Sequence, residues 1–251
     1  MERADRVCLV TGTSSGIGLA VARELVARGW DVTGIARRPS PLHHGRYRHV
    51  RLDLADLGAL EAALEGPEGE ALALDGRARV GLVNGAATVE PVGPTSALPA
   101  EALARAFAVG AVAPIWLLGF FLRRARGTAL RVVDVSSGAA RRPYAGWSAY
   151  CATKAALRMA GEVVGAEARE FAPGSVMTTD VAVVSYEPGV VDTEMQGVVR
   201  GSLASAFPHV RRFLDLHESG ALHPPERPAA EIAALLEADG LPPFSERRLG
   251  G

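Results

Sequence analysis

The sequence predicts an α/β fold, a doubly wound and mostly parallel sheet with helices on both faces, in a single domain spanning residues 1–251. Apolar, β-branched runs alternate with segments of helical periodicity along the chain, which is typical of successive right-handed βαβ units. Four of the apolar runs are nearly continuous rather than alternating, as expected for strands buried on both faces of a parallel sheet. No internal repeat or interdomain linker interrupts this pattern.

The predicted strands are short runs rich in Val, Ile, Leu and Ala. In chain order they are 6–11, 31–36, 48–52, 80–84, 129–135 and 181–186. The predicted helices carry apolar residues at helical spacing, and the first of them ends before a glycine, Gly29. In chain order they are 16–28, 57–64, 99–126, 148–172 and 228–238.

Three connections are predicted to lack regular structure. Residues 66–79 form a loose, acidic connection, and residues 197–225 form a long insertion after the last predicted strand. A connection of that length in a compact domain is usually functional, so 197–225 is interpreted as a substrate lid. The tail 241–251 contains Pro242-Pro243 and is not predicted as a strand, which leaves the carboxyl-terminal wall of any pocket undefined.

Composition excludes several classes of function. A formal net charge of -1 gives no basis for binding nucleic acid. Two cysteines, Cys8 and Cys151, cannot form a disulfide framework, and residues 1–10 lack the features of a signal peptide, so the cytoplasm is expected. No His, Cys, Asp or Glu cluster has metal-ligand spacing, so no metal is expected.

A stretch of uncharged residues raises the question of a membrane span. Residues 106–122 carry no charge, but they fall short of the usual length, and Gly110, Pro114 and Gly119 interrupt them. The stretch is therefore predicted to be a buried or subunit-interface helix, with no membrane as partner.

A glycine-rich loop, 11–18 (TGTSSGIG), joins the first strand to the first helix. Glycines in such a loop permit a tight turn, close approach of a pyrophosphate and packing of helix on strand. The helix N-terminus adds free N–H groups and partial positive charge for the anion. The loop predicts nucleotide binding, with a plain tight turn as the alternative; its candidate cofactor residues are Gly12, Ser14, Ser15, Gly16, Ile17 and Gly18.

The end of the second strand indicates which nucleotide is bound. An Asp or Glu about 20 residues after the glycines usually holds the ribose 2′-OH of NAD. Here Ala36 is followed by Arg37 and Arg38, and no acid is present. A guanidinium matches a 2′-phosphate, so the pair predicts NADP(H). Two solvated arginines at a strand end are the alternative.

Tyr150 and Lys154 lie four residues apart at the start of a predicted helix, so both point to one side. A neighbouring ammonium favours the phenolate and lowers the pKa of a phenol, which suits general acid–base chemistry. Lys154 is the single lysine among 27 basic residues, which marks a position where arginine does not serve. Such a pair also occurs by chance.

A serine precedes this pair at the end of another strand. Ser137 follows the strand at 129–135 and lies 13 residues before Tyr150. The carboxyl ends of parallel strands form the ligand crevice, where a hydroxyl is placed to donate to a substrate carbonyl. A serine that caps the next turn is the alternative.

Taken together, these motifs resemble the short-chain dehydrogenase/reductase family, with its Rossmann-type fold, over about residues 6–195. The resemblance rests on the glycine loop, the serine, and Tyr150-Cys151-Ala152-Thr153-Lys154. Further matches are Asp53-Leu54, Asn84-Gly85-Ala86-Ala87 and a Pro-Gly segment comprising Pro188, Gly189, Val191 and Thr193. Residues 192–196, 216–220 and 225–226 look most like the sepiapterin reductase and benzil reductase branch.

The resemblance implies a role for each matching residue. Hydride passes from the nicotinamide to a ketone carbon, Tyr150 protonates the oxygen, and Ser137 orients it. Lys154 lowers the pKa of Tyr150 and holds the nicotinamide ribose. Asp53 and Leu54 contact the adenine, Asn84, Gly85 and Ala86 line the cofactor pocket, and Thr193 holds the carboxamide.

The sequence departs from the family in the long helix at 99–126. The family usually carries a catalytic asparagine there, which holds a proton-relay water near the lysine; this chain has Gly110. Pro114 removes the usual hydrogen bond to the Gly110 carbonyl, and that carbonyl is then free to hold a water. Activity is therefore expected to survive. Thr153 replaces a commoner serine.

The leading hypothesis is an NADPH-dependent carbonyl reductase of a small apolar or aromatic ketone or diketone. Its predicted pocket residues are Tyr144, Trp147, Met195 and Phe207, with Leu203, Phe213 and Pro143 as further candidates. The alternatives are a non-catalytic NADP(H)-binding sensor or partner protein, supported by Gly110, and an NAD-linked alcohol dehydrogenase. The two long helices are expected to form a homodimer or homotetramer.

Overall fold

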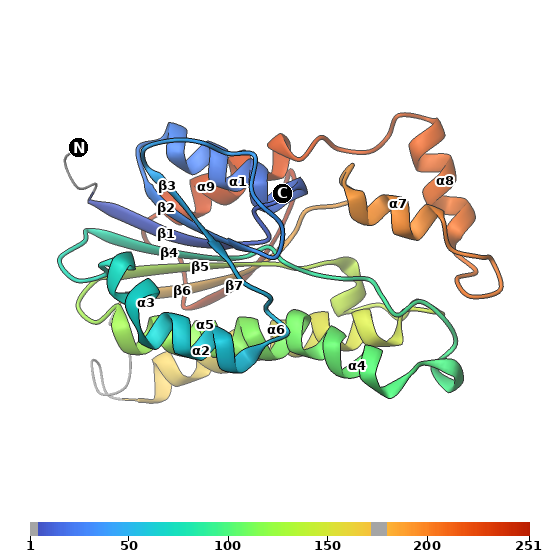
Figure 1. Ribbon diagram of the computed structural model, residues 1–251, viewed down its shortest axis with the longest axis horizontal. Helices are drawn as coiled ribbons and strands as arrows, with labels where there is room; N and C mark the ends of the chain where they lie inside the picture. Colours follow the sequence, from blue (N-terminus) through green and yellow to red (C-terminus); the bar gives the residue numbers. More distant parts are fainter. Residues whose placement is uncertain (1–4, 172–179) are drawn as a thin grey trace.

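The computed structural model describes residues 5–171 and 180–251 and contains a parallel sheet of seven strands. The strand order is β3-β2-β1-β4-β5-β6-β7, and every neighbouring pair is parallel (Figure 1). The strands are β1 Arg6–Thr11, β2 Asp31–Ala36, β3 Tyr47–Arg51, β4 Arg79–Asn84, β5 Ala129–Val135, β6 Val181–Glu187 and β7 Phe244–Arg248. Strand order runs in opposite directions on the two sides of the β1–β4 boundary, so the crevice at the carboxyl ends of these strands is the expected ligand site.

Helices cover both faces of the sheet, which confirms the predicted fold class (Figure 1). One face carries α1 Gly16–Ala27 and α9 Glu226–Glu237. The other carries α2 Leu57–Glu65, α3 Pro67–Leu72, α4 Ala100–Phe107, α5 Ala113–Arg124 and α6 Ser148–Glu170. Two further helices, α7 Glu194–Arg200 and α8 Val210–Glu218, form a lobe beyond the strand ends.

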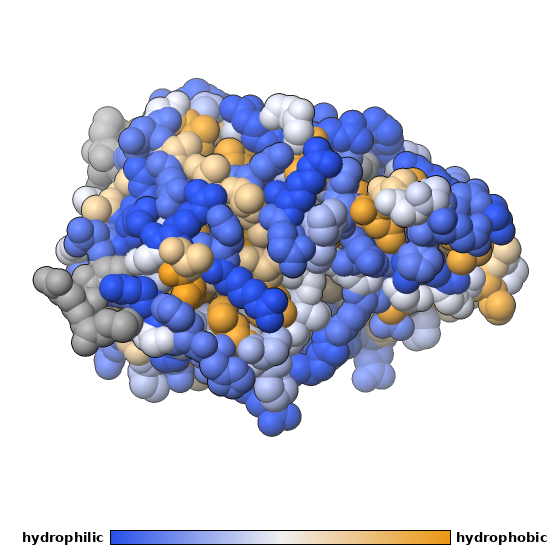
Figure 2. All heavy atoms as spheres, turned by 90° about the horizontal axis from the view of Figure 1, so that it is seen from above, coloured by the Kyte–Doolittle hydropathy of each residue, from blue (hydrophilic) through white to orange (hydrophobic). Residues whose placement is uncertain are grey.

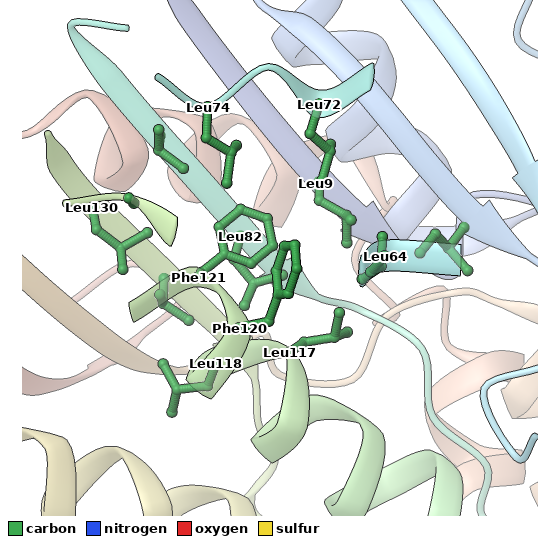
Figure 3. Close-up of a cluster of buried hydrophobic side chains, with 14 of the residues drawn as sticks. Leu9, Leu64, Leu72, Leu74, Leu82, Leu117, Leu118, Phe120, Phe121 and Leu130 are labelled. Atoms are coloured by element: carbon green, nitrogen blue, oxygen red, sulfur yellow. The ribbon is translucent and has the colours of Figure 1, made fainter. Parts of the chain in front are cut away.

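The core is divided by the sheet into two apolar layers. Leu9, Leu82 and Leu130 pack with Phe120 and Phe121 of α5 on one face (Figure 3). The residues that alternate with them along the strands pack against α1 and α9 on the other face. Burial on both faces explains why the strands are nearly continuous apolar runs.

The carboxyl-terminal tail contains a strand that the sequence did not predict. β7 pairs with β6 and closes the sheet. Its residues after Phe244 and Ser245 are charged, as is usual on an edge strand, so hydrophobic pattern gave no signal. Phe244 supplies the apolar contact, because a Cβ on Gly165 of α6 would lie 2.6 Å from the Phe244 Cβ. The expectation of an undefined tail was wrong, as was that of an unstructured 66–79, which contains α3.

The helix predicted at 99–126 is interrupted by a π-helical turn at Ala108–Val112. The Ala113 N–H donates to the carbonyl of Ala108, five residues back, and Pro114 follows without an N–H to give. The segment Ala100–Arg124 is long and apolar enough to cross a membrane, but much of it is buried against the sheet. The other long helix, α6, ends at Glu170, and its predicted end at Ala172 lies outside the described residues.

The molecular surface above α1 and α9 is mostly hydrophilic, with apolar residues in small separate patches (Figure 2). The lobe formed by α7 and α8 protrudes from one end of the molecule. That end holds the carboxyl ends of the strands, so the lobe covers the predicted ligand crevice.

Candidate active site

A cavity of about 850 Å³ opens at the carboxyl ends of the strands. It is lined by the glycine loop, the ends of β2, β4, β5 and β6, the start of α6, and α7 and α8. Its volume lies in the range of small-molecule and cofactor sites. The cavity brings together residues that are more than 200 positions apart in the chain, from Gly12 to Arg248.

The glycine loop forms a cradle that side chains would fill. Gly12 has a φ of 82°, and a Cβ there would lie 3.0 Å from the Ala86 backbone. A Cβ on Gly18 would lie 2.4 Å from the Gly12 carbonyl oxygen, so helix and strand pack in direct contact. Ser15, the N-cap of α1, makes no side-chain cap bond, which leaves the first N–H groups free for an anion. The cradle therefore fits the pyrophosphate of a dinucleotide.

Arg37 and Arg38 line the same cavity at the end of β2. The Arg38 Nη2 lies 3.2 Å from the Ser15 Oγ and 2.5 Å from a carboxylate oxygen of Glu194 in α7. The Arg38 guanidinium holds the pKa of Glu194 below its usual value. More than half of each charged side chain is exposed, so the guanidinium remains accessible to an anionic ligand.

The residues predicted to contact the adenine and the two residues that follow β4 all line the cavity. Asp53 and Leu54 line the cavity, and an Asp53 carboxylate oxygen accepts from Arg105 at 2.7 Å. Gly85 and Ala86 also line it, with their N–H groups bonded to the Thr11 hydroxyl at 3.0 and 3.1 Å.

The placement of Asn84 corrects its prediction as a pocket residue. Asn84 is 1% exposed and is not among the residues that line the cavity. As the last residue of β4 it points into the sheet face, where its Nδ2 donates to Asp134 at 2.7 Å. The cavity wall begins one residue later, at Gly85.

The Pro-Gly segment after β6 forms the opposite wall of the cavity. Pro188, Gly189, Val191 and Thr193 all line it. Thr193 lies against the glycine loop, since a Cβ on Gly16 would be 3.1 Å from the Thr193 Cγ2. These residues would therefore be available to hold a nicotinamide beside the glycine cradle.

Ser137, Tyr150 and Lys154 meet at this end of the cavity. The Ser137 hydroxyl is hydrogen-bonded to the phenol of Tyr150. Lys154 is only 3% exposed, and its Nζ donates to the Val135 carbonyl at 2.6 Å and lies 5.8 Å from the Tyr150 ring centroid. The helix α6 thus presents phenol and ammonium one turn apart, beside the end of β5.

Burial has the largest effect on the pKa of both Tyr150 and Lys154. It raises the pKa of Tyr150 to about 12, while the hydrogen bond with Ser137 lowers it. It lowers the pKa of Lys154 to about 8. The expected lowering of the Tyr150 pKa by Lys154 is outweighed, so the phenol is protonated at neutral pH. A protonated phenol suits proton donation to a substrate oxygen.

An aromatic wall borders the substrate end of the cavity. Tyr144, Trp147 and Met195 line it, as does Phe213 of α8. Phe207 is wholly buried and stacks on Trp147 with ring centroids 4.4 Å apart, so it supports the wall from behind. The prediction of Phe207 as a lining residue is corrected accordingly. Leu203 is 73% exposed and also lies off the cavity.

Several residues that line the cavity were not predicted from the sequence. Arg248 comes from β7, which hydrophobic pattern did not reveal. Gln196 comes from α7, which begins before the predicted lid, and Arg212 comes from α8 inside it. Arg142 lies in the short loop after Ser137, where its position in a run of small and charged residues gave no signal. The helical spacing of Val210 and Phe213 was available in the sequence as a sign of α8.

Gly110 and Thr153 are a complementary pair. A Cβ at Gly110, in the π-helical turn, would lie 2.9 Å from the Thr153 Cβ and 3.0 Å from its Oγ1. The threonine methyl, which a serine would lack, is the third contact, at 3.3 Å. The two departures from the family pattern are one packing arrangement.

This packing predicts the effect of restoring an asparagine. Gly110→Asn is expected to destabilise the protein by about 1–3 kcal/mol through overpacking. Thr153→Ser in the same chain removes the Cγ2 methyl at 3.3 Å but keeps the closer Cβ and Oγ1, so we expect the double variant to regain only a small part of the loss. Thermal unfolding at one protein concentration measures both. A Gly110→Asn variant as stable as wild type would contradict the packing argument.

The chain is similar to known proteins in both sequence and structure. A family model described as short chain dehydrogenase matches residues 6–203. Benzil reductase ((S)-benzoin forming) from Bacillus subtilis (strain 168) is 32% identical over 231 residues, covering 91% of this chain and 92% of its own. Sepiapterin reductase from Mus musculus is 32% identical over 258 residues, covering 93% and 92%.

Solved structures are similar over the same length. A short chain dehydrogenase/reductase from Saccharomyces cerevisiae superposes with a TM-score of 0.78 at 26% identity, covering 98% of this chain and 96% of that one. The two chains therefore share the fold along nearly their whole length.

Proposed function

The chain belongs to the short-chain dehydrogenase/reductase family of oxidoreductases, which bind nicotinamide cofactors, and from this premise we propose that it is an NADPH-dependent carbonyl reductase. Its substrate is a small apolar or aromatic ketone or diketone. One observation carries the proposal: Tyr150, Ser137 and Lys154 line the same cavity as the glycine cradle.

The preference for NADPH is supported by the charge at the end of β2. The cradle of the glycine loop would hold the pyrophosphate, and Arg38, beside Ser15, would hold the 2′-phosphate. The residues that follow β2 are Arg37 and Arg38, where an NAD-binding site would place a carboxylate. When bound, NADPH supplies a hydride for the carbonyl carbon.

The residues of the chain supply the proton and the orientation. Ser137 is placed to donate to the substrate oxygen, and Tyr150, protonated at neutral pH, gives its proton to that oxygen. The ammonium of Lys154, buried one turn along α6, stabilises the phenolate that remains. Burial in a cavity of low dielectric strengthens this stabilisation.

The aromatic wall supports an apolar or aromatic substrate. Trp147, Tyr144 and Phe213 face the end of the cavity that holds Tyr150, and Trp147 packs edge-on against Tyr150 with ring centroids 5.3 Å apart. Flat rings of a ligand gain area and favourable ring geometry against such a wall. The benzil reductases act, by their name, on a diaryl diketone, which fits this wall.

A carbonyl panel with NADPH oxidation as readout tests the proposal. We expect loss of reduced-cofactor absorbance with benzil and related aromatic diketones, faster with NADPH than with NADH. Tight NADPH binding without reduction of any carbonyl would favour a non-catalytic sensor. Faster turnover with NADH or NAD in the oxidative direction would favour an alcohol dehydrogenase.

A homodimer or homotetramer in the cytoplasm is part of the proposal. Apolar side chains on the π-helical turn, α5 and α6 are exposed; examples are Val112, Ile115, Met159 and Val163. Burial of such side chains between copies would remove them from water. No nucleic acid, membrane or metal is included among the partners. Light scattering on the purified protein measures the number of subunits.

A further inference from the structure

A row of buried polar side chains crosses the sheet beneath α6. Asn84 of β4 is in register with Asp134 of β5, and Asp134 is in register with Ser185 of β6. Their strand neighbours Leu82, Val132 and Val183 pack in the layer that includes α5, so side chains two residues on share that face. These polar residues are 1%, 1% and 5% exposed.

Asp134 is a carboxylate in this dry layer with incomplete hydrogen bonding. Its Oδ1 accepts from the Asn84 Nδ2 at 2.7 Å. Its Oδ2 and the Asn84 Oδ1 have no hydrogen-bond partner within the described residues. A buried carboxylate is costly unless a charge of opposite sign lies near it.

Lys154 is the cation that meets this requirement. Its Nζ is bonded to the carbonyl of Val135, the residue after Asp134, and Lys154 is 3% exposed. The charge of Asp134 raises the pKa of Lys154, and the charge of Lys154 lowers the pKa of Asp134. The buried ammonium of Lys154 and the buried carboxylate of Asp134 therefore form an electrostatic pair at the end of β5.

The other elements packed against this part of α6 bring no competing charge. There is no titratable side chain in the short helical turn Gly138–Ala140 or in the π-helical turn Ala108–Val112. On α6 itself Tyr150 is neutral, the thiol of Cys151 lies against the Arg142 carbonyl, and Arg158 is paired with Glu162 and Glu246.

Charges on the remaining neighbours are either paired or exposed to solvent, and Glu101 of α4 and Arg247 of β7 are exposed. Glu246 of β7 pairs with Arg141 and Arg158, and Glu187 at the end of β6 pairs with Arg248. Arg105 of α4 pairs with Asp53. The acidic group that faces Lys154 from within the sheet is thus Asp134.

We propose that Asp134 is a positioning residue for the reaction: its carboxylate keeps Lys154 charged and fixed beneath Tyr150. The consequence for turnover rests on the proposed function. The pairing of the two groups does not, and it is measurable in a protein that reduces nothing.

The pKa shifts of Lys154 and Asp134 have the directions expected for two buried groups of opposite charge. Burial lowers the pKa of Lys154 to about 8, and Asp134 raises it. Burial raises the pKa of Asp134 to about 6, while the bond from Asn84 and the charge of Lys154 lower it. Between these values both groups are charged. Turnover is therefore expected to fall below the lower value, as Asp134 is protonated, and above the higher value, as Lys154 loses its proton.

The single lysine of the chain makes the pairing directly measurable. Protein labelled with ¹³C-lysine has one lysine side chain, so its NMR titration reports Lys154 without assignment. Asp134→Asn keeps the acceptor for Asn84 and removes the charge. We expect the midpoint of Lys154 to move to lower pH in this variant. An unchanged midpoint would overturn the proposal.

A matched control and a second variant secure the test. Asp31→Asn removes the carboxylate at the start of β2, where it pairs with Arg46 and Arg77, and should leave the Lys154 midpoint unchanged. Lys154→Met leaves Asp134 without its counter-charge and should lower the melting temperature. Addition of Asp134→Asn to Lys154→Met should restore part of that loss; a further loss would contradict the pairing.

The same variant separates a positioning role from a structural one. Asp134→Asn is expected to shift the alkaline limb of the kcat profile to lower pH, with kcat about tenfold lower at pH 8 and little changed near neutral pH. KM for the carbonyl should change little, since Asp134 does not line the cavity. Equal loss of kcat at every pH, with an unmoved limb, would show structural damage instead.

Discussion

Tyr150→Phe is expected to lower kcat by about a thousandfold or more, while the protein folds and binds NADPH as before. The phenol is the proton donor to the carbonyl oxygen, and a positioned acid contributes about 10²–10⁴ to the rate. Phenylalanine keeps the edge-on packing against Trp147 and removes only the hydroxyl. Single-turnover NADPH oxidation, with fluorescence titration of the cofactor, measures the two quantities separately.

The matched control is a phenol on the opposite face of the sheet. The Tyr186 hydroxyl donates to Glu231 of α9 at 2.8 Å, away from the cavity. Tyr186→Phe should cost some stability and leave kcat near wild type. Retention of most of the activity in Tyr150→Phe would remove Tyr150 as the donor. Loss of cofactor binding in that variant would assign the residue to binding instead.

Removal of Arg38 is expected to raise the KM for NADPH by about 10- to 100-fold, with little change in the KM for NADH. A charge-assisted hydrogen bond to phosphate contributes about 1.5–3 kcal/mol, and each 1.4 kcal/mol is tenfold in affinity. The variant Arg38→Ala removes the guanidinium that lies beside Ser15. Initial rates with each cofactor give the ratio of kcat/KM, which should fall toward unity.

A control for lost surface charge is available on α5. Arg123 is 54% exposed in its side chain and pairs with Glu65, on the face of the sheet opposite to α1. Arg123→Ala should leave the cofactor ratio unchanged. An Arg38→Ala variant that keeps the wild-type preference would place the 2′-phosphate elsewhere, and equal weakening of NADPH and NADH would indicate damage to the loop.

The elements that position the site were predictable because their signals are local. Burial on both faces gives continuous apolar strands, and the glycine loop, Tyr150 and Lys154 follow a spacing set by one loop and one helical turn. β7 was missed because an edge strand with charged residues lacks that signal. The tertiary environment also decided the titration of Tyr150, since burial raises its pKa although an ammonium lies nearby.

The residues that complete the site depend on distant contacts. Asn84 fits the family motif, yet it pairs in register with Asp134, and its side chain bonds to that residue instead of lining the cavity. Arg248 enters the cavity because β7 pairs with β6, and the fit of Gly110 to Thr153 requires the contact of the π-helical turn with α6. No periodicity or spacing along the chain encodes these pairings.

The central claim, that this cavity reduces a carbonyl with Tyr150 as acid, is tested most directly by isotope transfer. The wild-type protein is incubated with benzil and NADPH deuterated at the transferable C4 position, and the product is analysed by mass spectrometry and NMR. The account predicts one deuterium on the new carbinol carbon, and loss of this product in Tyr150→Phe. Carbinol formed without deuterium, or deuterated product formed equally by Tyr150→Phe, would contradict it.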